Sequence, residues 1–398
     1  MNFWIAVPTY WTFPTTHPGK ENVVFDHPTP LDQDGDIARM LDSFRCLKGD
    51  YKIVIVIGVT NPSLNDAAHQ RVREIVKPYI KNVPICIVSL KNLKAFNAAL
   101  PEPILGLVGY GNIRNAQLAV PYSLGADAVI GIDDDEIIED SEFLSKVERW
   151  IGKKYNGDVV GGMAGPYLDR NGEYRIAGAE SLKTLDNIFN KKNYFMNEAI
   201  KSSMARAPQD GITLSNVAFG GNMVMHRDTI RVACHDPYIP RGEDYDYVIN
   251  AKMKGVNFYF QPSMSIIHLP PDSTGSQAAD KMSKLIADIR RFIYVQHKMR
   301  VHSERYPTER VPMDYVLPYP GPYIDPSVDL AAHAVRALDE LYPEFRKNGG
   351  NPDALVEDAV QTAKVKADEF FEYSIKWERA IKALENNEKA KRAMEFEG

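Results

Sequence analysis

The sequence is poor in cysteine and lacks both long apolar runs and clusters of basic residues. Its three cysteines, Cys46, Cys86 and Cys234, lie far apart without a CxxC pair, which argues against a disulfide framework or a cysteine-based zinc site. No stretch reaches the roughly 18 apolar residues that a bilayer-spanning helix needs. The net charge of -6, with no Lys/Arg-rich run, argues against a nucleic-acid-binding protein. We therefore expect no transmembrane segment and no nucleic-acid partner.

A secretion signal is also missing at the N-terminus. Residues 1–8 carry neither the basic flank nor the long apolar core of a signal peptide. We therefore expect a cytoplasmic protein, with a peripheral position at the membrane left open. At 398 residues, of which 44% are hydrophobic and 25% charged, the chain can form one large domain with an appendage, or two domains.

Two common nucleotide-binding motifs are absent. The glycine-containing segment 108–119 fits neither GxGxxG nor the P-loop pattern. It nevertheless places Arg114 and Asn115 near the start of an expected helix, where an arginine fork and backbone amides favour an anion. The alternative is a flexible loop whose arginine caps a surface helix.

An acidic run stands at the end of an apolar one. Residues 127–132 are mainly Ala, Val and Ile, which predicts a buried strand, and Asp133, Asp134 and Asp135 follow at once. Adjacent carboxylates repel one another unless a cation or donors hold them, and Mg²⁺ and Mn²⁺ take carboxylate oxygens. We interpret the run as a metal site for a phosphorylated ligand; the alternative is a loop that caps a following helix over 142–151.

Apolar segments alternate with amphipathic ones through the first half of the chain. Strands are expected at 3–7, 51–59 and 83–90, with helices at 36–47 and 67–80 and a loop over 92–107. This alternation predicts βαβ units and a mostly parallel sheet, that is, an α/β fold. Pro8, Thr9 and Tyr10 follow the first strand, where an aromatic face and a hydroxyl could hold a nucleobase.

The second half contains three more candidate site segments. A polar segment over 180–209 looks like a covering insertion, and the apolar segment 217–227 contains Gly220, Gly221 and Asn222. The glycines leave room for a close neighbour, and the asparagine offers a donor and an acceptor; a β-bulge is the alternative. Glu243 and Asp244 open an expected helix, where acids serve either as dipole partners or as a general base.

His268 ends a short apolar run, and beyond it the chain becomes helical. A lone histidine there is either structural or a ligand. Long helices are expected over 276–302, 327–342 and 353–394, the first facing either an anionic membrane or the sheet. The last suits an antiparallel appendage or a homo-oligomer contact. We expect a catalytic domain over 1–270 and a helical extension over 271–398.

In their order along the chain, these motifs resemble the GT-A glycosyltransferases, most nearly the family 2-like nucleotide-sugar transferases. The resemblance covers about residues 3–270, and its specificity lies in the order of the motifs. It implies the GT-A fold. It implies nucleotide-sugar binding by Pro8, Thr9, Tyr10, Arg114, Asn115, Asp133, Asp134, Gly220, Gly221 and Asn222, with the acids as the DXD motif. It also implies Asp135 and His268 as metal ligands, and Asp244, beside Glu243, as the catalytic base.

The function that this resemblance implies is hexose transfer, dependent on Mn²⁺ or Mg²⁺, from a UDP- or GDP-sugar to a hydroxyl of a sugar, polyol or lipid-linked acceptor. Inversion is expected with Asp244 as base, although a retaining enzyme could carry the same metal site. The acidic residue that usually follows the second strand is missing from 56–61, so the donor base stays open. A sugar nucleotidyltransferase and a non-catalytic carbohydrate- or nucleotide-binding scaffold are the alternatives.

Overall fold

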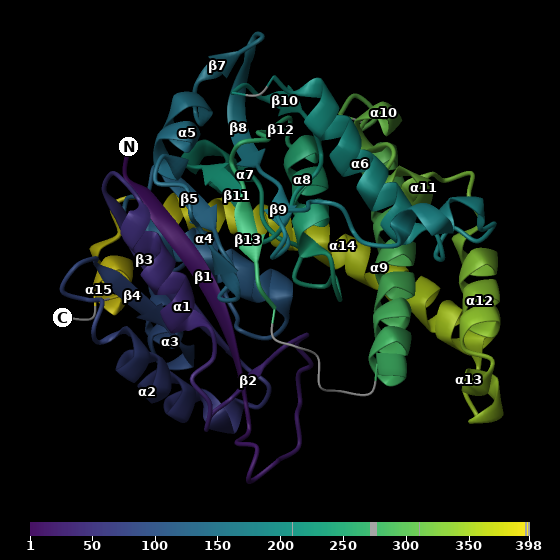
Figure 1. The fold of residues 1–398 in the computed structure, drawn as a ribbon, viewed down its shortest axis with the longest axis horizontal. Helices are drawn as coiled ribbons and strands as arrows, with labels where there is room; N and C mark the ends of the chain where they lie inside the picture. Colours follow the sequence, from purple (N-terminus) through teal and green to yellow (C-terminus); the bar gives the residue numbers. More distant parts are fainter. Residues whose placement is uncertain (209, 271–276, 310, 395, 397–398) are drawn as a thin grey trace.

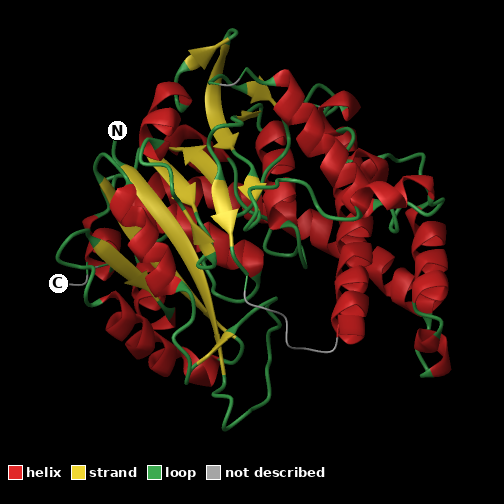
Figure 2. Cartoon of the chain, viewed as in Figure 1, coloured by secondary structure: helices red, strands yellow, loops and turns green. Residues whose placement is uncertain are grey.

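The computed structural model describes residues 1–208, 210–270, 277–309, 311–394 and 396, with only the backbone for residues 277–280. A central sheet is covered by helices on its faces, and helices from the C-terminal third stand beside it (Figure 1). Strands gather in one half of the molecule and the other half is helical (Figure 2).

Thirteen named strands occur in the described residues. They are β1 Phe3–Thr12, β2 Thr29–Pro30, β3 Tyr51–Val59, β4 Ile85–Val88, β5 Ala128–Gly131, β6 Glu136–Ile137, β7 Lys154–Tyr155, β8 Asp158–Ala164, β9 Tyr167–Leu168, β10 Thr213–Leu214, β11 Met223–His226, β12 Asn257–Phe260 and β13 Ile266–His268.

The α-helices are α1 Ile37–Ser43, α2 Asn65–Val76, α3 Leu90–Asn97, α4 Tyr110–Ser123, α5 Phe143–Trp150, α6 Lys192–Arg206, α7 Arg227–Val232, α8 Glu243–Met253, α9 Gln277–Arg305, α10 Met313–Val316, α11 Gly321–Ile324, α12 Leu330–Leu341, α13 Glu344–Lys347, α14 Pro352–Leu384 and α15 Glu388–Ala393. Short 3-10 helices span Phe44–Cys46, Pro62–Leu64 and Ala179–Thr184.

The main sheet is mostly parallel, as the sequence predicts. Its strand order is β10-β12-β8-β11-β5-β1-β3-β4, with β2 added to β1 and β7 to β8. Strands β5, β1, β3 and β4 are mutually parallel, and β11 enters antiparallel between β5 and β8. The parallel strands β3, β4 and β5 are nearly all apolar because helices cover both of their faces. The α/β fold class is confirmed.

A second, three-stranded sheet lies beyond the end of β5, in the order β6-β13-β9. Strands β6 and β13 are antiparallel, and His268 lies directly opposite Glu136 in their register. Opposed residues of an antiparallel pair place their side chains on the same face. This small sheet therefore brings the acidic run and the histidine together.

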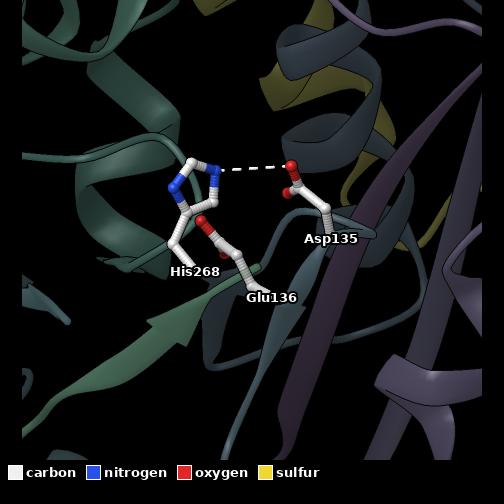
Figure 3. Close-up of side chains that lie close together, drawn as sticks. All are labelled: Asp135, Glu136 and His268. Carbon is white, nitrogen blue, oxygen red and sulfur yellow. Dashed lines mark ion pairs between the residues drawn. The ribbon is translucent and has the colours of Figure 1, made fainter. Parts of the chain in front are cut away.

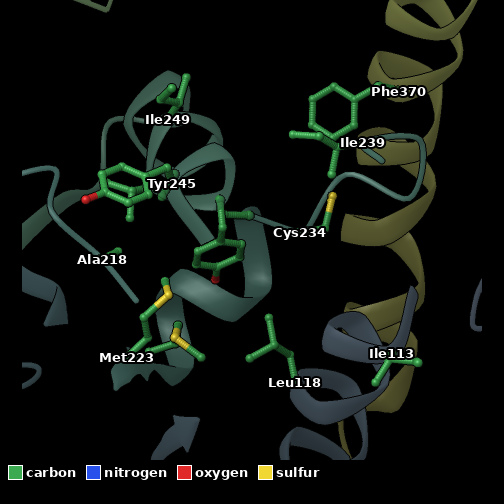
Figure 4. Close-up of a cluster of buried hydrophobic side chains, with 14 of the residues drawn as sticks. Ile113, Leu118, Ala218, Met223, Cys234, Ile239, Tyr245, Ile249 and Phe370 are labelled. Atoms are coloured by element: carbon green, nitrogen blue, oxygen red, sulfur yellow. The ribbon is translucent and has the colours of Figure 1, made fainter. Parts of the chain in front are cut away.

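The C-terminal helices share a hydrophobic core with the sheet region. The core cluster includes Trp4 of β1 and Trp377 of α14, both fully buried, and the Trp377 indole donates to the carbonyl of Ile230 at 2.8 Å. Figure 4 shows part of this core, where Cys234, Ile239 and Phe370 of α14 lie close together. The helical extension predicted beyond the sheet is thus packed on it as one body.

Helix α9 buries its apolar side in the protein, with Ile289, Phe292 and Val295 nearly inaccessible to solvent. The burial of these side chains supports the interpretation in which the helix packs on the protein, and not the one in which it faces a membrane. Its predicted start at Ser276 and the predicted domain boundary at residue 271 lie outside the described residues. In the described part of the chain, each helix is too short or too polar to cross a bilayer.

Two segments are more regular than the sequence predicts. The expected loop 92–107 contains the end of α3, because Ser89 and Asn92 form a capping box that starts this helix. The expected covering insertion over 180–209 contains the long helix α6, and its last residue, Gln209, lies outside the described residues. A capping box stabilises α3, and burial of one face, at Leu93 and Phe96 in α3 and at Ala199 and Ile200 in α6, stabilises each helix.

Candidate functional site

Three side chains that can bind a metal ion converge at the end of β5. Strand β5 ends at Gly131, and the chain then passes through the acidic run into β6, which starts at Glu136. One ligand atom each of Asp135, Glu136 and His268 lies within 4.8 Å of the others. Figure 3 shows the imidazole of His268 facing the carboxylate of Asp135, with Nε2 at 3.3 Å from Oδ2.

Glu136 is the member of this cluster that the sequence interpretation missed. Its Oε2 accepts a hydrogen bond from the backbone N–H of Asp133 at 2.8 Å. Its Oε1 is buried without a hydrogen bond of good geometry, although the hydroxyl of Tyr167 acts on this carboxylate. Burial, together with the charges of Asp133 and Asp135, raises the pKa of Glu136 well above its usual value. A buried carboxylate beside two other ligand atoms suits a cation site.

The donor set fits a divalent cation. Two carboxylates and one imidazole suit Mn²⁺, because carboxylate oxygens are typical ligands of Mg²⁺ and Mn²⁺ and imidazole is typical of transition metals. Burial by itself lowers the pKa of His268, but the hydrogen bond to Asp135 and the charges of Asp135 and Asp133 raise it above its usual value. Burial and the charge of Asp135 raise the pKa of Asp134 to about 8. Arg114 and His268 thus offset the charges of Asp133 and Asp135, while the crowding of acids raises the pKa values of Asp134 and Glu136.

Arg114 links the acidic run to the start of α8. Its Nη1 lies 2.8 Å from Oδ1 of Asp133, and its Nε donates to Oε1 of Glu243 at 3.2 Å. The guanidinium is almost fully buried, and both neighbours are carboxylates held at fixed positions. The nitrogens Nη1 and Nε thus face the protein's own acids. Through these two ion pairs, Arg114 connects the acidic run at Asp133 with the start of α8 at Glu243.

The two acids at the start of α8 have different environments. Glu243 is buried and ion-paired with Arg114. Asp244 is partly exposed, and its Oδ1 accepts the backbone N–H of Tyr245 at 2.8 Å. Burial and the charge of Glu243 raise the pKa of Asp244 to about 6. Of the two, Asp244 has the accessible carboxylate with a pKa close to neutrality.

The space beside Gly220 and Gly221 is filled by the protein's own side chains. A β-carbon on Gly220 would overlap the guanidinium of Arg114, and one on Gly221 would overlap the carboxylate of Glu136. The backbone N–H of Gly221 also donates to the hydroxyl of Tyr167 at 2.5 Å. The glycines allow close approach, as the sequence suggests, but the groups that approach are Arg114 and Glu136.

Two asparagines predicted at the site bond to backbone instead. The Asn222 amide donates to the carbonyls of Met264, at 2.8 Å, and Pro166, at 3.3 Å. Asn115 exchanges hydrogen bonds with the backbone of His235, both at 2.8 Å, and donates to the hydroxyl of Tyr373 at 3.1 Å. Both side chains are buried, and neither is bonded to the acidic run. The structure therefore places them as supports of the surrounding loops.

Pro8, Thr9 and Tyr10 lie within β1, which continues to Thr12 rather than ending at Val7. Thr9 is fully buried. The ring of Tyr10 packs at 4.4 Å, centroid to centroid, from Phe25 and at 5.5 Å from Tyr110. The aromatic face expected to hold a nucleobase is thus adjacent to two protein rings, one of them from the long link between β1 and α1.

No family model matches the chain and no curated protein does. Among solved structures, the mannosyltransferase PcManGT from Pyrobaculum calidifontis in complex with GDP-Man and Mn²⁺ aligns with a TM-score of 0.44 at 12% identity, covering 92% of this chain and 86% of that one. Glucosyl-3-phosphoglycerate synthase from Mycobacterium tuberculosis in complex with Mn²⁺ and uridine-diphosphate-glucose aligns with a TM-score of 0.37 at 12% identity, covering 71% and 77%.

Proposed function

We propose that the protein is a GT-A-type, metal-dependent glycosyltransferase that moves a hexose from a nucleoside-diphosphate sugar to a hydroxyl acceptor with inversion. The observation that supports this most directly is the pairing of two centres through Arg114: a cation-binding set of Asp135, Glu136 and His268, and a partly exposed base candidate, Asp244. Ligands of α/β sheets bind beyond the carboxyl ends of the strands, where these residues lie.

Asp135, Glu136 and His268 would hold the cation, which makes Glu136 an addition to the predicted ligands. When bound, a divalent cation neutralises the charge that develops on a departing diphosphate. Asp133 is ion-paired with Arg114 and keeps 27% of its side chain exposed, and this exposed part would accept hydrogen bonds from a donor nucleotide. Asp134 lies beside the proposed cation site and would contact the donor nucleotide.

Asp244 would remove the proton from the acceptor hydroxyl. As that oxygen forms its bond to the anomeric carbon, the bond from this carbon to the diphosphate oxygen breaks on the opposite face, and the nucleoside diphosphate leaves. A pKa of about 6 leaves the carboxylate ionised at pH 7 yet basic enough to accept the proton. Glu243, held by Arg114, positions the helix start rather than contacting the acceptor.

Replacing a metal ligand tests the first centre. We expect Asp135→Ala to abolish Mn²⁺-dependent turnover of UDP- or GDP-sugars, measured as release of nucleoside diphosphate, because the cation loses a charged ligand. Glu139→Ala changes an exposed acid in the same segment and should leave turnover unchanged. Turnover of nucleoside triphosphates with sugar phosphates, but not of nucleotide-sugars, would point to a nucleotidyltransferase instead. Binding without turnover would point to a non-catalytic scaffold.

Replacing the base tests the second centre. We expect Asp244→Asn to lower kcat for transfer by about 10²–10⁴-fold, the usual contribution of a general base, while donor binding measured by calorimetry stays as in the wild type. Glu243→Gln should weaken the link to Arg114 and retain part of the turnover. Wild-type turnover by purified Asp244→Asn would refute the base assignment.

A further inference from the structure

Three cations from three parts of the chain lie close together beside the start of α8. They are Lys192, the first residue of α6, Arg241, in the loop before α8, and Arg291 of α9; we call them the basic cluster. Lys192 Nζ lies 2.5 Å from Oδ2 of Asp288, and Arg291 Nε lies 3.2 Å from its Oδ1. The charge of Arg241 acts on the same carboxylate. Asp288 thus contacts two of the cations directly, and the third acts on it through its charge.

The cations of this cluster have acidic neighbours but keep exposed surface. Burial by itself raises the pKa of Asp288, but the three surrounding cations lower it below its usual value. Burial lowers the pKa of Lys192; Asp288 partly restores it, and the two arginines lower it further. Arg241 faces Asp26 at 3.6 Å, and the charge of Arg291 also acts on Asp244. Asp26 is 44% exposed and Asp244 is partly exposed, so water screens the charges of both acids.

The basic cluster adjoins Asp244. Arg291 packs on the backbone of Gly242, where a β-carbon would overlap its guanidinium, and Gly242 has the positive φ of 72° that favours glycine. The charge of Arg291 also counteracts the effect of burial on the pKa of Asp244. Its Nη2 donates to the hydroxyl of Tyr319 at 2.6 Å, so residues of the C-terminal helical region form this wall.

We propose that the basic cluster binds an anionic group of the acceptor, a phosphate or a carboxylate, so that the acceptor hydroxyl lies at Asp244. This inference rests on the proposed function, in which Asp244 is the base. Lys192 and Arg241 keep 21% and 28% of their side chains exposed, and guanidinium and ammonium groups are the usual partners of phosphate and carboxylate. The C-terminal helical region, through Arg291, would then take part in selecting the acceptor.

Inorganic phosphate and acetate are the probes for this site. Each is titrated into the full-length protein with Mn²⁺ and a nucleoside diphosphate present, so that phosphate does not fill a donor site, and binding is followed by calorimetry. We expect saturable binding of at least one probe. Lys192→Gln and Arg241→Gln should each weaken it about tenfold or more, because one charged contact is lost. If only phosphate binds, the acceptor should carry a phosphate group. If acetate binds as well, the acceptor can carry a carboxylate instead.

Lys191→Gln is the matched control, since Lys191 is the preceding residue and is similarly part-exposed, and it should bind the probes as the wild type does. The two test positions are the more exposed members of the basic cluster, with 21% and 28% of their side chains accessible, against 8% for Arg291, so the variants should fold. Failure of both probes to bind, or equal binding by Lys192→Gln, would overturn the proposal. Mn²⁺-dependent donor hydrolysis, measured on the same samples, separates this failure from failure of the proposed function.

Discussion

Two centres in the protein have the same composition, one cation between two carboxylates, and the first turn of α8 contributes an acid to each. Arg114 lies between Asp133 and Glu243. Lys298 of α9 lies between Asp236, at 2.8 Å, and Asp246, at 2.6 Å. The sequence alone suggests that the acids of this turn balance the helix dipole. The structure shows that Glu243 and Asp246 contact different partners, Arg114 and Lys298.

The two centres differ in their access to solvent. Lys298 and Asp236 have no exposed side-chain surface, and the ammonium has a third partner in Asn250 at 3.1 Å. The Arg114 centre is open at one end, where the Asp133 side chain is 27% exposed beside the cation-binding residues. The Lys298 centre is fully enclosed and its ammonium group has three partners, so it holds the helical region on the α/β part. The Arg114 centre has one open side, so it can contact a ligand. Similar chemistry therefore serves attachment in one place and, by our proposal, catalysis in the other.

Removing the cation of the enclosed centre should have the largest effect on stability. Lys298→Met leaves Asp236 and Asp246 buried without their counter-charge, so we expect the free energy of unfolding to fall by about 3–5 kcal/mol, measured by urea denaturation. Arg290→Met, on the same helix, breaks an exposed pair with Asp358 at 3.4 Å and should cost less than about 1 kcal/mol. Equal losses in the two variants would mean that the Lys298 centre does not hold the helical region in place.

A conservative change at the open centre should have a smaller effect on stability and a larger effect on turnover. Arg114→Lys keeps the charge but cannot maintain contacts with both Asp133 and Glu243. We expect the free energy of unfolding to fall by about 1.5–3 kcal/mol, the usual value of one hydrogen bond to a charged group. The loss should not be larger, because water can reach Asp133 and solvate its carboxylate. Turnover should fall while the melting temperature changes little compared with Lys298→Met. If stability falls as much as in Lys298→Met, the open centre is structural as well.

The pH dependence of transfer should be the smallest of the three effects. The pKa of Asp244 is raised to about 6, so the basic form predominates above that pH and is lost as the pH falls through it. At one pH unit below the pKa, about a tenth of the carboxyl groups remain ionised, so kcat/KM should be about tenfold lower than on the plateau. The remaining activity of Asp244→Asn should lack this acidic limb. An acidic limb retained in that variant would assign it to another group.

Local sequence patterns were sufficient to predict the strands of the sheet that carries the candidate site. The apolar run that becomes β5, followed at once by Asp133, predicts a buried strand with acids at its end because burial on both faces requires continuous apolar side chains. The span 51–59 is a strand with the same bounds in the structure. The alternation of strands and helices also predicts the mostly parallel sheet, because parallel neighbours need crossover connections.

The partners of the site residues depend on contacts that no local pattern contains. Glu136 joins His268 because β6 and β13 pair in one particular register, and a shift of one residue would turn either side chain to the other face. Gly220 and Gly221 signal close approach, but only packing shows that Arg114 and Glu136 are the groups that approach. The basic cluster unites residues from α6, from α9 and from the loop before α8. Sequence thus determined which segments form strands and where acids stand, whereas tertiary packing decided which charges meet, because their energies depend on distance and burial.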